Sequence, residues 1–278
     1  MTTNEIAIIE ASQFPALVSD GDTDLAEVIA ENLGGDGLQP RDLDRVPIPG
    51  GGGTTWEIES LVGTESFREL EGIIIAQQTA RKFWSQSLDE SDETTPPDCA
   101  SDEGHVGSGI FGVGSSLHPS GDCATCPMNQ WGSGSDDPSS DKGPKACREG
   151  KLLYLLRPGD IIPSTLLLPP TSLNDYRDYM KALTKSRLFF HSVVTKFSLE
   201  KAESGGKRWS IVKPSLGGVL DPETAATARA LGVTLKTAYN ARMAELRANP
   251  IDTTEAETPV ADPKATEKTE KPKPAAKS

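Results

Sequence analysis

All four cysteines of this chain lie in one segment, between positions 99 and 147 of 278 residues. The segment reads C-x23-C-x2-C-x20-C, and its other residues are mostly glycine, serine, aspartate and proline, too polar to form a core. A loop of that length is uncommon in a compact domain unless something else organises it. A bound metal ion can do so, because ligation energy becomes folding energy where the unfolded chain has no preformed site.

Four thiols at this spacing predict a zinc site. Cys123 and Cys126 are separated by two residues, which is the usual half of a tetrahedral zinc site. The two outer cysteines, arriving from flanking segments, would complete the coordination sphere and leave no open position. We therefore expect one structural Zn²⁺ per chain, without a catalytic role, bound by Cys99, Cys123, Cys126 and Cys147.

Other interpretations of the cysteines stay open at this point. His105 or His118 could replace one cysteine as a ligand, and two disulfides or four unrelated thiols are the plainer alternatives. A redox role for the Cys-x-x-Cys pair lacks the βαβ pattern that usually surrounds one. The N-terminus shows no signal peptide, and no run of about 18 apolar residues occurs, so we expect a reducing, cytoplasmic location without membrane association.

Charge is distributed unevenly along a chain whose net charge is −13. Residues 1–62 contain twelve acidic and two basic side chains, a net charge of −10. Residues 142–213 contain fourteen basic and six acidic side chains, a net charge of +8. This asymmetry indicates a basic working surface on an otherwise acidic protein, although lysines scattered over solvated faces would produce the same count.

Hydrophobic periodicity predicts more strands than helices. The expected strands lie at 5–10, 54–58, 70–84, 151–156, 161–168, 190–200 and 207–213. The expected helices lie at 22–32, 172–186 and 221–247, and Gly232 is a point at which the last one could divide. The glycine run at 50–53 lacks the lysine of a phosphate-binding loop, so we interpret it as a turn into the strand that follows.

These elements predict a mainly β, α+β fold built around a small OB-like barrel, with peripheral helices and a zinc-stapled loop. The expected organisation is an acidic N-terminal extension with a helix at 1–44, an OB-like core at 45–215 with a zinc-binding insertion at 97–148, a C-terminal helical segment at 216–249 and a disordered tail at 250–278. The tail consists almost entirely of Thr, Glu, Lys, Pro and Ala, too polar to offset the entropy of ordering it.

Aromatic and basic residues occur together at several points of the predicted core. OB barrels bind single strands through a basic groove with aromatic platforms, since each base offers a π-face and each phosphate a charge. Strand alternation places Lys82 and Trp84 on the same face, and core packing is the alternative for each tryptophan. The expected nucleic-acid-binding residues are Arg81, Lys82, Trp84, Trp131, Lys207, Arg208 and Trp209.

Four short motifs carry a resemblance to a largely uncharacterised family of bacteriophage and mobile-element proteins: residues 96–102 (PPDCASD), 123–133 (CATCPMNQWGS), 143–147 (GPKAC) and 168–173 (LPPTSL). The resemblance covers roughly residues 45–215 and implies a bacterial host cell. In architecture the chain is also similar to the zinc-containing single-stranded DNA-binding proteins of phages, although their ligands include a histidine. Such proteins usually end in an acidic peptide, whereas residues 271–278 (KPKPAAKS) are basic.

The sequence therefore predicts a non-catalytic single-stranded DNA-binding protein of phage replication or recombination, with replication or recombination proteins as further partners. The alternative is a zinc-stapled interaction or regulatory protein, such as a host-defence antagonist or adaptor, whose acidic N-terminal helix binds a partner. A zinc deaminase needs H-x-E and P-C-x-x-C, but Val106-Gly107 follow His105 and Asp122 precedes Cys123. A metal-dependent nuclease needs paired carboxylates, and none are recognisable in this chain, so we expect no enzyme activity.

Overall fold

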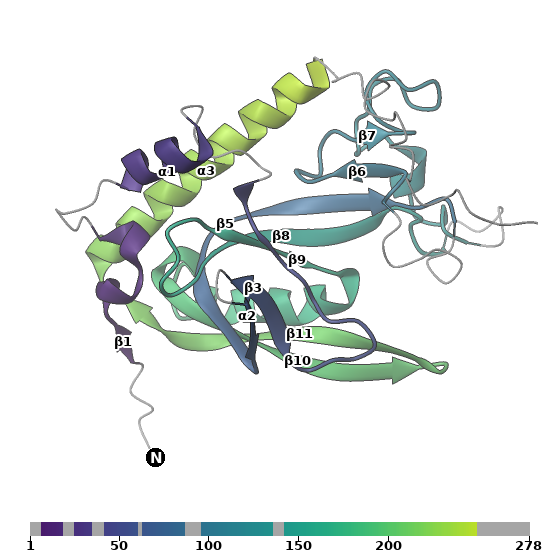
Figure 1. Ribbon diagram of the computed structural model, residues 1–278. Helices are drawn as coiled ribbons and strands as arrows, with labels where there is room; N and C mark the ends of the chain where they lie inside the picture. Colours follow the sequence, from purple (N-terminus) through teal and green to yellow (C-terminus); the bar gives the residue numbers. More distant parts are fainter. Residues whose placement is uncertain are drawn as a thin grey trace, which may run out of the picture.

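The strand β5 (Glu69–Phe83) runs through the middle of the protein (Figure 1). The computed structural model describes residues 7–18, 25–34, 42–60, 63–86, 96–135 and 142–248. The first half of β5 contains the apolar run Ile73–Ile74–Ile75, and all three side chains are buried. A continuous apolar run of this kind is typical of a strand covered on both faces, and β5 is covered on both.

Antiparallel partners flank β5 on its two sides, and the sheet continues outward from each in the order β1-β11-β10-β5-β8-β9-β2. The bounds of these strands are β1 (Ile8–Ile9), β11 (Lys207–Leu220), β10 (Val193–Ser204), β8 (Arg148–Leu156), β9 (Ser164–Leu168) and β2 (Arg45–Val46). The short strand β6 (Cys99–Ser101) pairs with the end of β5, and β7 (Ser108–Gly109) pairs with β6.

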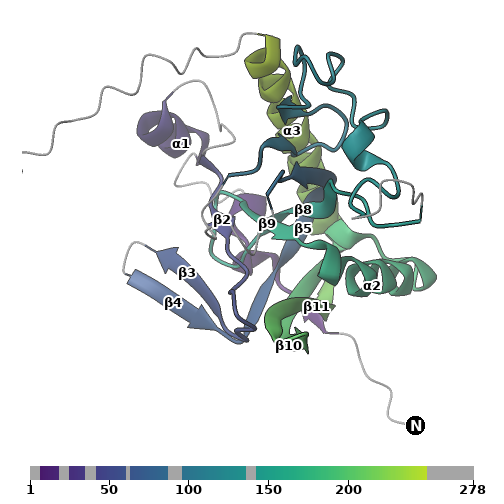
Figure 2. The same cartoon turned by 90° about the vertical axis from the view of Figure 1, so that its right-hand side faces the viewer.

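Helices lie on the two faces of this sheet (Figures 1 and 2). On one face, α3 (Pro222–Ala248) contributes Ala228 and Tyr239 to a core cluster that includes side chains of β5 and β8. On the other face, α2 (Leu173–Lys185) contributes Tyr176 to a second cluster with β5, β8, β9 and β10. The sheet therefore separates two hydrophobic cores.

A hairpin of β3 (Trp56–Ser60) and β4 (Gly63–Phe67) forms a separate two-stranded sheet beside the second core. The Trp56 side chain anchors it, since the side chain is fully buried and its Nε1 donates a hydrogen bond to the Phe197 carbonyl oxygen at 2.8 Å. The turn at residues 50–53 leads into β3 without a helix, as the sequence predicts.

The main sheet is open, so the expected closed OB-like barrel is wrong, while the mixed, strand-rich α+β class is confirmed. The outer strands β1 and β2 pair with β11 and β9 respectively, and no described residues pair them with each other. Helices provide the physical reason. With α2 and α3 each covering one face, the sheet buries its apolar side chains without closing on itself.

Most expected elements appear close to their predicted positions. The helix expected at 22–32 is α1 (Leu25–Leu33), and the one expected at 221–247 continues unbroken through Gly232 as α3. The tail at 250–278 and parts of the N-terminal extension lie outside the described residues. Within the described part of the chain, no helix has the length and apolar character that crossing a bilayer requires.

Candidate functional site

The four cysteines come together at the end of β5 and line one cavity. They are contributed by β6, by the turn before the short 3-10 helix η4 (Pro127–Asn129) and by the residue that precedes β8: Cys99, Cys123, Cys126 and Cys147. The cavity measures about 20 Å³, and its other walls include Phe83, Phe111 and Met128. A volume of this size holds about one water-sized atom.

Burial raises the pKa of three of these thiols. The pKa of Cys147 is raised to about 11, mainly by desolvation, and desolvation is also the leading cause of the raised pKa values of Cys99 and Cys123. The Arg81 guanidinium opposes the increase at Cys123 and Cys147. A cation in the cavity would favour the thiolates further, since the thiolate is the form that binds metal.

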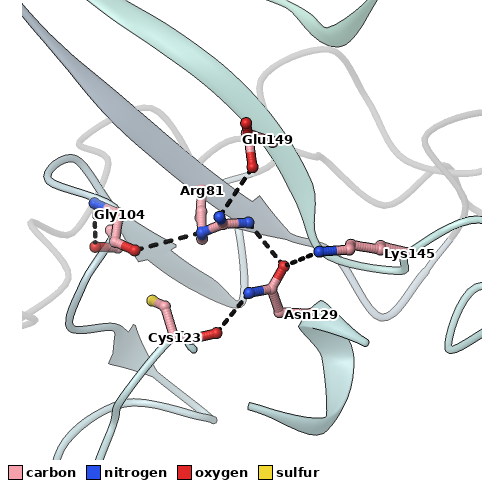
Figure 3. Close-up of polar contacts among 7 residues, drawn as sticks. Arg81, Gly104, Cys123, Asn129, Lys145 and Glu149 are labelled. Carbon is pink, nitrogen blue, oxygen red and sulfur yellow. Dashed lines mark hydrogen bonds and ion pairs between the residues drawn. The ribbon is translucent and has the colours of Figure 1, made fainter. Parts of the chain in front are cut away.

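A polar network joins the cysteine cavity to the sheet, and Asn129 is its centre (Figure 3). The Asn129 side chain is buried; its Nδ2 donates to the Cys123 carbonyl oxygen at 2.6 Å, and its Oδ1 accepts from Arg81 Nη1 at 2.7 Å and from Lys145 Nζ at 3.1 Å. Arg81 also forms an ion pair with Glu149 at 2.9 Å. The network therefore links β5, β8 and the Cys-x-x-Cys turn.

The thiols are not arranged as a formed metal site. No three or more His, Cys, Asp or Glu side chains in the described residues have that arrangement, so ligation would require the four thiols to close in on the cavity. The described cysteines are free thiols, not disulfides. Neither histidine of the segment lines the cavity; His105 is exposed, and His118 Nε2 lies 2.9 Å from the Asp122 carbonyl oxygen.

Two adjoining hollows of about 200 and 470 Å³ lie near the other side of the β5–β8 strand ends. Leu167 and Pro169 line both, so the hollows lie side by side and together make a depression with two parts. Strands β2, β5, β8, β9 and β11 all contribute to its wall. We call this depression the basic groove, after the cationic and aromatic side chains that line it: Arg45, Lys82, Trp84, Arg148, Arg208 and Trp209.

Two of the four cations of the basic groove have no paired carboxylate in the described part of the chain, whereas Lys82 feels the opposing charge of Asp102 and Arg208 forms an ion pair. Arg45 and Arg148 are exposed, and no carboxylate among the described residues pairs with either. The pKa of Lys82 is lowered, first by burial and then by the positive charge of Arg45. The one carboxylate that lines the groove, Glu149, already pairs with Arg81, whereas Arg208 pairs with Glu203 outside it. The groove is therefore suited to an anion.

Trp84 and Trp209 are half-buried, and each lines one of the two hollows of the groove. The indole Nε1 of Trp209 is buried and has no hydrogen-bond partner. A buried donor without a partner costs free energy, and an acceptor on a bound ligand would remove that cost. Neither tryptophan is among the fully buried core residues, so core packing alone does not account for them.

Four of the seven expected nucleic-acid-binding residues come together in the groove: Lys82, Trp84, Arg208 and Trp209. The other three lie elsewhere. Arg81 belongs to the Asn129 network; Trp131 is 71 % exposed in the cysteine segment with Lys145 Nζ 5.2 Å from its ring centroid; Lys207 is exposed at the β10–β11 turn. Trp131 and Lys207 remain predictions, whereas the ion pair and hydrogen bonds of Arg81 give it a structural role.

Sequence reasoning missed Arg45 and Arg148 as groove residues. Arg148 directly follows Cys147 within the basic stretch 142–213, and this position was the available signal. Arg45 lies in the acidic N-terminal region and reaches the groove only because β2 pairs with β9. No protein-family model, no curated protein and no solved structure matches this chain.

Proposed function

We propose that the protein is a non-catalytic single-stranded DNA-binding protein, and that the basic groove holds the strand. The observation that carries this proposal is the gathering of four cations, of which Arg45 and Arg148 have no paired carboxylate among the described residues, and two half-buried tryptophans along one depression. The resemblance of its sequence motifs to those of bacteriophage proteins is what suggests a role in phage replication or recombination. No catalytic residue is part of the proposal.

The chemistry of the groove suits a single strand better than a duplex. In a duplex the base faces are stacked on one another, so a tryptophan in a depression can reach them only after the strands separate. A single strand presents a base face and a phosphate at every nucleotide, and stacking on an aromatic side chain contributes about 1–3 kcal/mol per base. Trp84 and Trp209 would stack with bases, while Arg45 and Arg148 would contact phosphates.

A fluorescence titration of the full-length protein with labelled single-stranded and duplex oligonucleotides, each at two salt concentrations, tests the proposal. Trp84→Ala should weaken single-strand binding by about 1–3 kcal/mol. Arg148→Gln should weaken it for every sequence and reduce the slope of log K against log salt by about 0.7, the release expected for one single-strand phosphate contact.

Two variants outside the groove serve as matched controls. Lys181→Gln removes a cation of α2 that pairs with Asp178, and Phe189→Ala removes an aromatic ring that is 67 % exposed. Both should bind like the unmodified protein. Equal losses in the controls and in the groove variants would show that binding is diffuse. Tight binding to duplex alone, or no binding at low salt, would favour a protein partner with an acidic peptide.

A further inference from the structure

We propose that the four-cysteine cavity binds one Zn²⁺ ion and that this ion holds the end of the basic groove in place. Cys99, Cys123, Cys126 and Cys147 are the ligands. The metal site is argued from the cysteine segment alone, whose four thiols line one cavity and would close in on the ion. Its effect on the groove rests on the function proposed above, and the two parts have separate tests.

The four thiols converge on one cavity. Three separate parts of the segment bring one sulfur, two sulfurs and one sulfur to a cavity with room for about one atom. Arg81 lines the same cavity as the four cysteines, so its charge is placed to balance the net negative charge of four thiolates around one zinc ion. A soft, four-thiolate ligand set without oxygen donors selects zinc over magnesium or calcium.

The cysteine segment also has little apolar packing of its own. Among the described residues from 99 to 147, the only buried apolar side chains are those of Cys123 and Cys126. Larger apolar side chains such as Ile110, Val113 and Leu117 are exposed, so the segment has no hydrophobic core of its own. Turn hydrogen bonds connect its loops, and metal ligation would supply the missing folding energy.

The ligands are directly connected to the groove. Cys99 pairs with Phe83 in the β5–β6 ladder, and Trp84 is the next residue along the chain. Cys147 precedes Arg148, which pairs with Lys82 in the β5–β8 ladder. A single ion bound by both Cys99 and Cys147 would therefore fix the C-terminal end of β5, with Lys82 and Trp84, and the start of β8, with Arg148. Loss of the ion would release both ends together.

Metal content tests the site itself. The full-length protein, purified under reducing conditions from zinc-supplemented cells, should contain about one zinc per chain, and the chelated protein should take up Co²⁺ with the visible absorption of a tetrahedral thiolate complex. Cys126→Ser should lose the metal, whereas the matched variant His118→Ala should keep it. No zinc together with no Co²⁺ uptake would overturn the site, and loss of metal in His118→Ala would overturn the four-cysteine ligand set.

Hydrogen exchange tests the connection between the metal site and the groove without using a nucleic acid. If Cys126→Ser does not fold, wild-type protein from which a chelator has removed the metal takes its place. Chelation should speed amide exchange at residues 81–84 and 148–152, and leave α2 unchanged. Single-strand affinity should fall about 5- to 150-fold, the loss of one stacked base, and recover when zinc is restored.

The outcomes separate the two proposals. Metal binding that changes neither exchange nor affinity would overturn the connection to the groove. Amide exchange that depends on the metal, in a protein that binds no oligonucleotide, would support the role of the zinc ion in holding the groove and overturn the proposed function. Oligonucleotide binding by a protein that takes up neither zinc nor cobalt would support the proposed function and overturn the zinc site.

Discussion

Replacing Gly232 by alanine sets two effects of opposite sign against each other. Gly232 lies in the middle of α3, where alanine is normally stabilising by about 1 kcal/mol because glycine is a poor helix former. The same residue faces the backbone of β5. A Cβ atom at this position would overlap the Ile75 carbonyl oxygen and lie 2.5 Å from the Ile75 carbonyl carbon.

The collision should outweigh the helix propensity. Overpacking usually costs about 1–3 kcal/mol, and the upper part of that range applies because the obstacle is backbone that cannot rotate away. A shift of α3 would also weaken the packing of Ala228, Leu235 and Tyr239 against the sheet. Subtracting the propensity gain of about 1 kcal/mol leaves a net destabilisation of about 2 kcal/mol for Gly232→Ala.

Urea unfolding and thermal melting, both followed by circular dichroism, measure this difference. A loss of about 2 kcal/mol corresponds to a fall of about 4–8 °C in melting temperature for a protein of this size. Ala230→Gly is the matched control, because Ala230 is exposed on α3 and should lose about 1 kcal/mol by propensity alone. A higher melting temperature for Gly232→Ala would refute the close contact between α3 and β5.

Three further predictions concern two sets of buried hydrogen bonds and the C-terminal tail. Trp56→Phe removes the hydrogen bond to the Phe197 carbonyl and should lower the free energy of unfolding by about 1–3 kcal/mol in urea; an unchanged value would mean that the β3–β4 hairpin is not anchored there. Asn129→Ala leaves Arg81 and Lys145 without their shared acceptor and should cost about 1.5–3 kcal/mol, with Thr227→Ala on exposed α3 surface as a near-neutral comparison. Truncation after Asn249 should leave the melting temperature nearly unchanged, because residues 250–278 are too polar to contribute a core, and a large fall would count against this.

The positions of the helices and strands could be predicted because local sequence patterns indicate them. Alternating apolar residues in β10 and a continuous apolar run in β5 have different periodicities, and both were recognisable. Helix α3 begins after Asp221, whose Oδ1 accepts hydrogen bonds from the amides of Glu223 and Thr224, a typical N-cap. Gly232 misled the prediction, since its reason for being there is tertiary: it permits close approach of β5.

The arrangement of the strands could not be predicted in the same way. An open sheet and a closed barrel use the same alternation along each strand, and they differ only in what the outermost strands pair with. Here β1 and β2 are two residues each. A strand was expected at 5–10, where β1 lies, but within the supposed N-terminal extension; β2, at the start of the expected core, was not predicted, and nothing in the sequence indicated the partner of either strand. The register of β2 with β9 is what brings Arg45 to the groove.

For the candidate site, the sequence predicted the residues of the cysteine cavity better than those of the groove. Four cysteines within one polar segment restrict the possible partners to one another, and the structure brings all four to one cavity. The groove depends on strand pairing and on side-chain direction, so composition identified only part of it. Arg81 shows the difference. It stands beside Lys82 in sequence, but alternation directs it to the Asn129 network.

The positive charges of Lys82 and Arg45 lie near each other in the groove and should lower the stability of the protein when no ligand is bound. The substitution Arg45→Glu tests this. The lowered pKa of Lys82, caused by burial and then by Arg45, means that the unfolded chain binds this proton more tightly. The free energy of unfolding should therefore rise as pH increases from the lowered pKa to the usual value of 10.5. Arg45→Glu would replace the repulsion from Arg45 by a second carboxylate near Lys82, in addition to Asp102, adding about 0.2–1 kcal/mol at neutral pH, while weakening single-strand binding. A variant both less stable and equally able to bind would show that the groove is not shaped for an anion; greater stability with lower affinity is the combination expected of a binding surface that trades stability for function.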